Sequence, residues 1–390
     1  MRIVHVNYDA RECGGASIAM LRMHRALRGI GVDSRIVCIE NADDPHSEVL
    51  QRPLLFRFLK FLGKVFTKVL SGEVHSTGLI PSGMADYVNQ LKPDVVMLHW
   101  LQQDTMSVRE IAKFNCPVFW YFHDMWPLSG LTPHSWYPVP RSLGWLDRYC
   151  RKVKRRIVQS MGRKLIPACA SKWVAEQIQN SNVFAGAAPV VIPLAIDACF
   201  KRRYRMASRR FRMLNGARGG LKAGLKGGDR LVAAFKLLPD DMKRQMELVI
   251  FGSSGESSKI EGVAVSYVGI QRGEALAQLY RDSDLFVFPS RMETFGQTKI
   301  EALSCGTPVI AFDQAACSEG IVHKRTGWVS PHDDVPDFAR GIRFFFERWR
   351  DGNPFRVDSI DECYDGEFVA RRICEEVSRA SGDIENKELT

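Results

Sequence analysis

Two glutamates, Glu293 and Glu301, stand eight residues apart and are the first candidates for chemistry in this sequence. Residues 285–288 before them form an apolar run that predicts a buried parallel strand. Residues 297–305, which lack glycine and proline, predict a helix, and residues 309–312 predict the next strand. Because ligands of such units bind at the carboxyl ends of the strands, we expect Glu293 in a binding loop and Glu301 about two turns into the helix.

Carboxylates at this spacing suit a ligand with a sugar or hydroxyl groups at one end, phosphates in the middle and a ribose at the other end. The backbone N–H groups of residues 296–298 open the predicted helix and can face an anion. The spacing by itself is equally compatible with two solvated glutamates on a protein surface.

The start of the chain has the pattern of another strand–turn–helix–strand unit. Residues 3–6 predict a strand, 17–27 an amphipathic helix and 34–39 the next strand, with Gly14 and Gly15 in the turn. The turn lacks the G-x-G-x-x-G spacing, so it gives little support for a dinucleotide site. Its glycines allow a ligand or another backbone to approach closely, and a tight turn without a ligand is the alternative.

Histidines stand at the ends of two further predicted strands. Residues 94–100 and 118–122 are apolar runs typical of buried parallel strands. His99 lies at the end of the first run, and His123 and Asp124 directly follow the second. Active-site groups belong at such strand ends. For His99, a satisfied core or surface histidine is an equal alternative.

Basic residues recur at helical spacing within residues 54–70, and bulky apolar residues fill the opposite side of the predicted helix. The basic residues are Arg57, Lys60, Lys64 and Lys68. Such a helix is typical of a segment that lies in a membrane surface, and a surface helix packed on its own domain is the alternative. Residues 148–164 carry eight basic residues, which could contact phosphates or form a solvated helix face.

The composition, with 45% hydrophobic and 25% charged residues, is that of an ordinary soluble protein, and 390 residues predict two domains. The sequence has no apolar run long enough to span a membrane, and a strand pattern directly after Met1 argues against a signal peptide. The net charge of +10 favours anionic lipid or nucleic acid alike. Ten cysteines without C-x-x-C pairs indicate reduced thiols and no metal site.

The stretch 286–312 resembles retaining glycosyltransferase family 4, which has the GT-B fold. The resemblance rests on the E-x7-E pair, on Pro-Ser before it, and on the ETFG, EA and CGTPV runs. It implies that Glu293 contacts hydroxyl groups of a donor sugar and that Glu301 holds the ribose of the nucleotide. The other residues that it places at the donor are Phe295, Gly296, Gln297 and Thr298, together with Gly14 and Gly15 near the donor phosphates.

The run His123-Asp124-Met-Trp-Pro resembles the branch of this family that builds exopolysaccharide and lipopolysaccharide. The resemblance implies that His123 lies beside the donor sugar and helps to organise the reaction centre. It leaves Asp124 and His99 as candidates on the acceptor side. Members of this branch often carry further cysteines after the motif, whereas only His134 and Cys150 are nearby here, which is too few for a zinc site.

Two cations on the donor diphosphate are a further property of the resembled family. They stabilise the charge that grows on the leaving phosphate as the glycosidic bond breaks. The matching residues here are Arg218 and Lys226, and Lys226 is the closer match. Arg218 follows Gly-Ala instead of a single glycine, and the loop is lengthened by the run GGLKAG, so Lys222 competes with Arg218 for the role.

The resemblance implies an α/β protein of GT-B fold, in which two Rossmann-like doubly wound domains face each other across a cleft. We expect an acceptor domain over 1–193, a nucleotide-sugar domain over 194–366 and a closing helix over 367–390 that returns to the first domain. The expected reaction is retaining transfer of a hexose or related sugar from a UDP- or GDP-sugar to a hydroxyl of a lipid-linked or growing surface polysaccharide. No cofactor, metal ion or nucleic acid is expected. The expected location is the cytoplasm, with an anionic membrane surface as a partner for residues 54–70.

Two other classes of protein are also compatible with the sequence. One is a GT-B epimerase or phosphorylase; an epimerase would lack the E-x7-E context, and a phosphorylase would release a sugar phosphate when given inorganic phosphate. The other is a non-enzymatic basic protein that binds membranes or nucleic acid, which would show salt-dependent binding but no turnover of nucleotide sugars.

Overall fold

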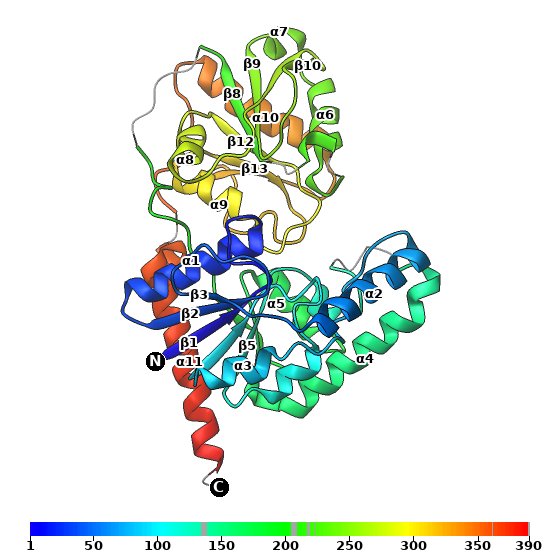
Figure 1. Ribbon diagram of the computed structural model, residues 1–390. Helices are drawn as coiled ribbons and strands as arrows, with labels where there is room; N and C mark the ends of the chain where they lie inside the picture. Colours follow the sequence, from blue (N-terminus) through cyan, green and yellow to red (C-terminus); the bar gives the residue numbers. More distant parts are fainter. Residues whose placement is uncertain (134–138, 204–208, 217–218, 223, 361, 389–390) are drawn as a thin grey trace. The chain divides into compact units, whose positions relative to one another are not determined.

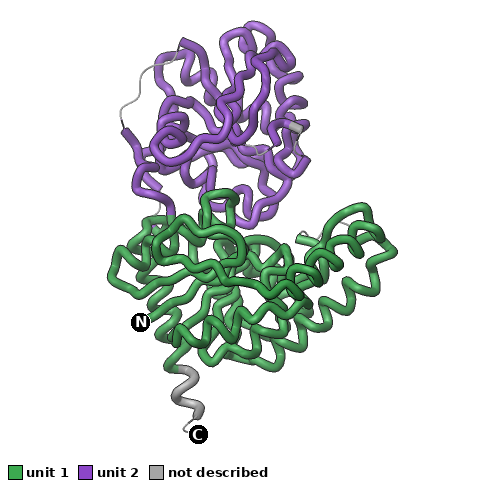
Figure 2. The backbone as a smooth tube through the Cα atoms, in the orientation of Figure 1, with its two compact units in different colours: residues 1–195, 363–390 green, residues 196–362 purple. Residues whose placement is uncertain are grey.

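The computed structural model describes residues 1–133, 139–203, 209–216, 219–222, 224–360 and 362–388. The chain forms two units (Figure 2). Unit 1 consists of residues 1–195 and 363–390, and unit 2 consists of residues 196–362. These bounds lie a few residues from the expected domain boundaries.

A seven-stranded parallel sheet with the order β3-β2-β1-β4-β5-β6-β7 forms the centre of unit 1 (Figure 1). Its strands are β1 (Arg2–Val6), β2 (Asp33–Cys38), β3 (Ser47–Val49), β4 (Val95–Leu98), β5 (Val118–Phe122), β6 (Leu165–Cys169) and β7 (Val190–Val191). Every residue of β4 and β5 is buried, as expected for central strands of a parallel sheet covered on both faces. The strand order reverses between β1 and β4, so ligands of this unit are expected at the carboxyl ends of those two strands.

Helices from both ends of the chain cover this sheet. They are α1 (Gly15–Gly29), α2 (Leu54–Ser71), α3 (Met84–Gln90), α4 (Gly144–Met161), α5 (Lys172–Gln179) and α11 (Gly366–Glu388), with short 3₁₀ turns η1 (Val108–Lys113), η2 (Trp126–Leu128), η3 (Arg141–Leu143) and η4 (Gly162–Lys164). Helix α11 packs against α1, so the last helix closes on the unit that begins the chain. Within the described ranges, no helix has the length and apolar character needed to cross a bilayer.

Unit 2 has the same architecture, with a seven-stranded sheet of order β10-β11-β9-β8-β12-β13-β14 in which only the pairing of β10 with β11 is antiparallel. Its strands are β8 (Phe211–Gly216), β9 (Met246–Phe251), β10 (Ser258–Ile260), β11 (Val263–Tyr267), β12 (Leu285–Phe288), β13 (Val309–Phe312) and β14 (Gly327–Ser330). Its helices are α6 (Gly228–Lys236), α7 (Asp240–Lys243), α8 (Gly273–Arg281), α9 (Gln297–Ser304) and α10 (Val335–Arg350), with 3₁₀ turns η5 (Gly220–Lys222) and η6 (Gly224–Lys226). The 3₁₀ turn η7 (Glu362–Tyr364) lies where the chain returns from unit 2 to unit 1. Here the strand order reverses between β8 and β12.

Helix α9 follows β12 through a loop that ends at Gly296. Gly296 has a φ of +82°, and a Cβ there would lie 2.9 Å from Cζ of Phe288, so both the backbone and the packing favour glycine. Glu301 is the fifth residue of α9 and lies just over one turn into it, so the expectation of two turns was wrong. The other predicted strands and helices are confirmed with small shifts at their ends, whereas β3, β10, β14, α3, α7 and α10 were not predicted.

Candidate functional site

The two charged residues predicted in the loops after β8 and β12 form an ion pair at the reversal point of the unit 2 sheet. Lys226 Nζ donates to Glu293 Oε1 at 2.6 Å. The Lys226 side chain is 36% exposed and that of Glu293 is 15% exposed, so the pair is accessible to a ligand. The Glu293 carboxylate is the main reason why the pKa of Lys226 is raised. An ammonium group has three donors, so Lys226 can also donate to an anion.

The loops that carry this ion pair touch each other through their backbones. Gly227 has a φ of +66°, and a Cβ added there would lie 2.0 Å from the carbonyl oxygen of Pro289. The backbone N–H of Arg291 donates to the carbonyl of Leu225 at 2.9 Å. The distance between the cation and the carboxylate therefore depends on a glycine at position 227.

A turn at residues 314–317 holds the Glu293 loop from another side. Lys299 of α9 is buried and donates to the carbonyls of Ala316 and Cys317. The N–H of Ala316 in turn donates to the carbonyl of Glu293 at 3.3 Å. Burial lowers the pKa of Lys299 to about 8. Lys299 thus fixes the loop and is directed away from solvent.

Glu301, the second carboxylate of the motif, is buried in α9. Tyr280 of α8 donates its hydroxyl to Oε2 of Glu301 at 3.1 Å. Thr307 donates to the carbonyl of Tyr280 at 2.5 Å, which anchors the end of α8. The sequence interpretation missed Tyr280, whose hydroxyl orients one carboxylate oxygen of Glu301.

In unit 1, the predicted strand-end histidines belong to a row of three rings, of which His5 and His99 are buried and His123 is half-buried. His123 Nε2 lies 2.8 Å from His99 Nδ1, and His99 Nε2 lies 2.9 Å from His5 Nδ1. Both ring nitrogens of His99 are therefore engaged, and its side chain is buried. His99, expected as an acceptor-side candidate, can act on a ligand only through His123.

The row continues from His5 across β2 to a carboxylate. Ser34 Oγ lies 3.1 Å from His5 Nε2 and 2.8 Å from His24 Nδ1. His24 Nε2 faces Asp44 Oδ1 at 3.4 Å. The sequence interpretation missed His5, Ser34, His24 and Asp44. A histidine inside the apolar strand β1 was the available signal, because a buried polar group requires a partner.

The carboxylate at the end of this row sets the direction of its hydrogen bonds. The negative charge of Asp44, 3.4 Å from His24 Nε2 and not hydrogen-bonded to it, favours the tautomer that carries its proton on Nε2, and His24 then accepts from Ser34 at Nδ1. The same direction continues through His5 and His99, because each neutral ring donates at one nitrogen and accepts at the other. His123 is consequently protonated at Nε2 and has an acceptor at Nδ1.

Burial keeps these rings neutral. It lowers the pKa of His24 to about 4 and that of His123 to about 3. It also lowers the pKa values of His5 and His99 well below the usual value. Neutral rings are the form that the one-directional row requires.

Asp124, the other acceptor-side candidate, is held by three donors in its own unit. Its carboxylate accepts from Trp100 Nε1 at 2.8 Å, from Gln102 Nε2 at 2.5 Å and from the backbone N–H of Trp126 at 2.8 Å. Burial raises the pKa of Asp124. Lys154 fixes the same turn by donating to the carbonyl of Trp126 at 2.7 Å.

Asn7 at the end of β1 connects the glycine-rich turn to the end of β4. Its amide donates to the carbonyl of Asp9 at 2.7 Å and to Ser17 Oγ at 3.1 Å, and its Oδ1 accepts from the N–H of Trp100 at 2.9 Å. The sequence interpretation missed Asn7. Gly14 has an extended backbone with φ −159°, and a Cβ there would meet no atom within 4 Å. A tight turn therefore does not account for this glycine.

The remaining candidates are less closely defined. Phe295 is buried, and Gln297 and Thr298 form the half-buried first turn of α9. Gly15 begins α1, and Lys222 ends η5. Arg218 and His134 lie outside the described residues. The ten cysteines are free thiols, and no group of metal-binding side chains occurs in the part of the chain that the structure describes.

Two doubly wound units with polar groups at both reversal points define the GT-B class of proteins. The Anabaena protein HepE, solved with UDP-glucose, aligns with a TM-score of 0.61 and 15% identity over 99% of this chain and 100% of that protein. The lipopolysaccharide outer core galactosyltransferase WaaB aligns with a TM-score of 0.62 and 14% identity over 97% and 100% of the two chains. At these identities the likeness shows the fold, and the predicted GT-B fold is confirmed.

Two glycosyltransferase profiles match the chain, one in each unit. The profile described as Glycosyltransferase Family 4 matches residues 13–199, and the profile described as Glycosyl transferases group 1 matches residues 222–356. The two matches together span most of the chain, which belongs to glycosyltransferase family 4. The predicted family is confirmed.

Curated relatives match a shorter part of the chain. The D-inositol 3-phosphate glycosyltransferase of Jonesia denitrificans is 37% identical over 132 residues, which are 30% of this chain and 31% of that protein. The corresponding protein of Mycobacteroides abscessus is 34% identical over 130 residues, which are 30% of this chain and 28% of that protein. The chain thus spans less than a third of the length of these curated relatives.

Proposed function

We propose that this protein is a retaining glycosyltransferase that moves a sugar from a nucleotide sugar to an acceptor hydroxyl. The observation that carries the proposal is the ion pair of Lys226 and Glu293, 2.6 Å long, at the reversal point of the unit 2 sheet. A cation and a carboxylate in contact can hold neighbouring parts of one ligand, the cation a phosphate oxygen and the carboxylate a sugar hydroxyl. In a nucleotide sugar, these parts flank the bond that breaks.

The charge that develops on the leaving group determines the role of Lys226. As the glycosidic bond breaks, negative charge grows on the diphosphate, and a cation already in position stabilises it without reorganisation. The backbone N–H groups at the start of α9, near Gln297 and Thr298, favour the same anion. We assign the second cation to Arg218, with Lys222 as the competitor.

The remaining candidates are assigned to the sugar and the ribose. Glu301, oriented by Tyr280, accepts hydrogen bonds from ribose hydroxyls. His123 has an acceptor nitrogen that suits a sugar hydroxyl. The acceptor attacks from the side on which the diphosphate leaves, and the leaving phosphate takes the proton of the acceptor hydroxyl, so the configuration at the anomeric carbon is retained. The mechanism needs no protein nucleophile.

We assign a UDP- or GDP-sugar as the donor and a lipid-linked or growing surface polysaccharide as the acceptor. HepE was solved with UDP-glucose, and WaaB is named for the lipopolysaccharide outer core, which supports both classes of substrate. The His123-Asp124-Met-Trp-Pro run supports the same acceptor class.

Two variants test whether the carboxylates of Glu293 and Glu301 have separate roles. Glu301→Ala should weaken binding of the bare nucleoside diphosphate by about 1.5–3 kcal/mol, because a charged hydrogen bond to the ribose is lost. Glu293→Gln should lower turnover with little loss of nucleotide affinity, because its contact with the sugar strengthens mainly in the transition state. Calorimetry with UDP and GDP, together with a turnover assay on a panel of nucleotide sugars, measures both effects.

The two measurements also discriminate among the alternatives. Equal losses of nucleotide affinity in both variants would refute the separate roles. Normal turnover in both variants would remove Glu293 and Glu301 from the active site. Release of a sugar phosphate on addition of inorganic phosphate would indicate a phosphorylase instead.

A further inference from the structure

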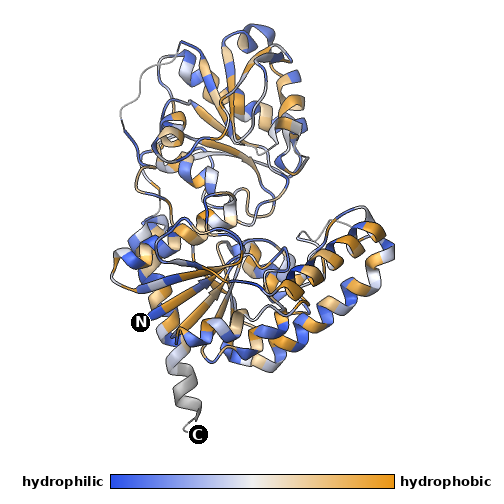
Figure 3. Cartoon of the chain, viewed as in Figure 1, coloured by the Kyte–Doolittle hydropathy of each residue, from blue (hydrophilic) through white to orange (hydrophobic). Residues whose placement is uncertain are grey.

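Helix α2 presents a broad apolar surface to solvent. Only Phe56 and Thr67 of this helix are buried, whereas Leu54 is 79% and Val69 is 77% exposed. The exposed apolar side chains of α2 are Leu54, Leu55, Phe58, Leu59, Phe61, Leu62, Val65, Phe66, Val69 and Leu70. Figure 3 shows the apolar colouring along this helix. The helix does pack on its own unit, through Phe56, Thr67 and its contact with η3, as in the expected alternative, but that packing leaves its apolar half exposed.

These exposed side chains form one continuous half of the helix. At about 100° per residue, their positions follow one another around the helix from Phe61 to Leu70 without a polar residue between them. The buried pair Phe56 and Thr67 lies on the opposite side, and the basic residues follow one edge of the apolar half, with Lys68 nearest to it. Soluble monomers rarely expose a contiguous apolar surface of this kind. Such a surface marks a site of interaction with a membrane or another protein.

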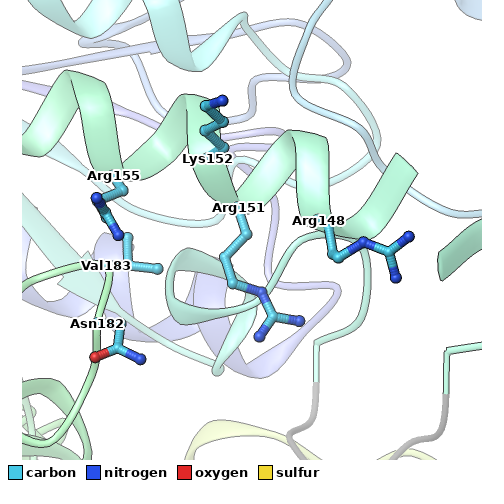
Figure 4. A pocket seen from close by; sticks show the side chains of 6 residues that line it. All are labelled: Arg148, Arg151, Lys152, Arg155, Asn182 and Val183. Carbon is cyan, nitrogen blue, oxygen red and sulfur yellow. The ribbon is translucent and has the colours of Figure 1, made fainter. Parts of the chain in front are cut away.

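Helix α4 adds a basic surface next to the end of α2. The Ser142 hydroxyl, just before α4, donates to the carbonyl of Leu70 at 2.6 Å, and Trp145 and Tyr149 at the start of α4 are exposed. The exposed basic residues of α4 are Arg148, Arg151, Lys152, Arg155 and Arg156. Four of them line a hollow of about 370 Å³ that Asn182 and Val183 close, and Figure 4 shows Arg148 and Arg151 extending to the same side of α4.

Acidic residues balance only a small part of this charge, because Lys60 of α2 faces Glu40 at 3.9 Å and Arg151 of α4 pairs with Asp147. Helix α2 contains no acidic residue, and the single acidic residue of α4, Asp147, is buried and paired with Arg151. On α10 and α11, by contrast, exposed arginines pair with glutamates of the same helix, as Arg343 does with Glu347 and Arg371 with Glu367. The surface of α2 and α4 therefore combines apolar side chains, exposed aromatic residues and an excess of positive charge.

We infer that α2 and the exposed side of α4 dock unit 1 on an anionic lipid bilayer. The apolar half of α2 lies at the boundary of headgroups and acyl chains, and the basic residues of both helices contact lipid phosphates. A second copy of the chain is the less suitable occupant, because a two-fold interface would bring the same basic residues face to face. The inference is independent of the proposed reaction.

Vesicle sedimentation tests the inference with two variants and matched controls. The vesicles contain phosphatidylcholine alone or phosphatidylcholine with phosphatidylglycerol, at low and high salt. The apolar variant is Phe58→Ser, Leu62→Ser and Phe66→Ser, and its control in unit 2 is Leu237→Ser, Ile270→Ser and Val322→Ser. The basic variant is Arg148→Ala, Lys152→Ala, Arg155→Ala and Arg156→Ala, and its control in unit 2 is Lys236→Ala, Arg244→Ala, Lys259→Ala and Lys324→Ala. All of these side chains are exposed, so the variants should fold, and circular dichroism checks that they do.

The wild type should bind vesicles that contain phosphatidylglycerol, and high salt should weaken the binding. The apolar variant should lose about tenfold or more in affinity, and the basic variant should lose most of the phosphatidylglycerol dependence, while both controls bind like the wild type. Nucleotide affinity by calorimetry should be unchanged in all variants. Equal sedimentation of wild type and apolar variant would overturn the inference. So would a wild type that ignores vesicles but dimerises in solution through α2.

Discussion

The row from Asp44 to His123 shows how one carboxylate can set the state of a distant side chain. Each ring in the row has one donor and one acceptor nitrogen, so a single direction of hydrogen bonding satisfies every member. Ser34 is the link on which this direction depends, because it accepts from His5 and donates to His24. The row therefore gives unit 1 a fixed acceptor at His123 at the end of β5.

Ser34→Ala should break the direction of the row. His5 would lose its acceptor, and His123 should become a mixture of its two neutral tautomers, which ¹⁵N NMR of labelled histidine distinguishes. We expect turnover to fall about tenfold while nucleotide affinity is kept, because His123 is assigned to a sugar hydroxyl and Ser34 contacts no nucleotide.

The control for this variant is Ser283→Ala, which removes another buried serine hydroxyl in unit 2. A variant that merely loses stability should resemble this control in turnover and should leave the His123 tautomer unchanged. A pure Nε2–H tautomer with normal turnover in Ser34→Ala would show that Asp44 does not control His123.

Among the elements, the loops after β8 and β12 are positioned by one close backbone contact. The positive φ of Gly227 and the 2.0 Å distance from its added Cβ to the carbonyl oxygen of Pro289 mean that no other residue fits without a shift. This contact sets the distance between Lys226 and Glu293, and helix α6 begins directly behind it at Gly228.

Gly227→Ala should push the two loops apart. We expect a loss of about 1–3 kcal/mol in the free energy of unfolding, measured by urea denaturation. Affinity for a nucleoside diphosphate should fall about tenfold or more, because Lys226 is displaced from the anion. Gly224→Ala is the matched control, because a Cβ there meets no atom within 4 Å. Equal behaviour of the two variants would contradict the positioning role of Gly227.

The sequence predicted much of this architecture but not its contacts. Apolar runs such as 118–122 and 285–288 predicted the central strands, because buried parallel strands need apolar residues on both faces. The partnership of Lys226 with Glu293 was not predicted, since each was considered only as a ligand contact. The link of His5 to His99 joins residues 94 positions apart, so only the pairing of β1 with β4 reveals it.

Helix α2 is a second case in which the sequence predicted an element but not its contacts. Its amphipathic pattern predicted a helix over 54–70, and the structure has one at Leu54–Ser71. The pattern could not decide whether the apolar half is covered, because periodicity records the face of a helix and not what lies against it. The exposure of Phe58 and Phe61 in the structure answers that question for this unit.

In the molecule as a whole, the two units share a doubly wound architecture but differ in their buried ionisable groups. Unit 1 buries His5, His24 and His99 in its core, whereas the histidines of unit 2, His323 and His332, are exposed. Among the side chains that the structure describes, Lys154 of unit 1 and Lys299 of unit 2 are buried, and burial lowers the pKa of Lys154 to about 7 and that of Lys299 to about 8. The buried lysines therefore have a similar effect on the pH dependence of stability in both units. The buried histidines are the groups that distinguish unit 1 from unit 2.

Mild acid should consequently unfold unit 1 before unit 2. A histidine that is neutral in the folded unit takes up a proton on unfolding once the pH is below the unfolded pKa of about 6.5, so the unfolded state gains protons and stability falls with pH. The loss is about 1.4 kcal/mol per pH unit for each such histidine, and it continues down to the folded pKa, which is about 4 for His24 and about 3 for His123. Above pH 6.5 the histidines should have no effect on stability.

Hydrogen exchange measured by mass spectrometry at pH 7.5 and pH 5.5 in moderate urea, corrected for intrinsic exchange rates, resolves the two units in one experiment. Peptides from β1, β4 and β5, and from α11, which belongs to the same unit, should lose protection together at the lower pH, while peptides from β9 and β12 keep theirs. Carboxylates whose pKa is lowered occur in both units, among them Asp9, Asp33, Asp229 and Asp337, and they lose their contribution only below the unfolded pKa of about 4. Equal loss of protection in both units, or earlier loss in unit 2, would show that the buried histidines do not govern the acid stability of this protein.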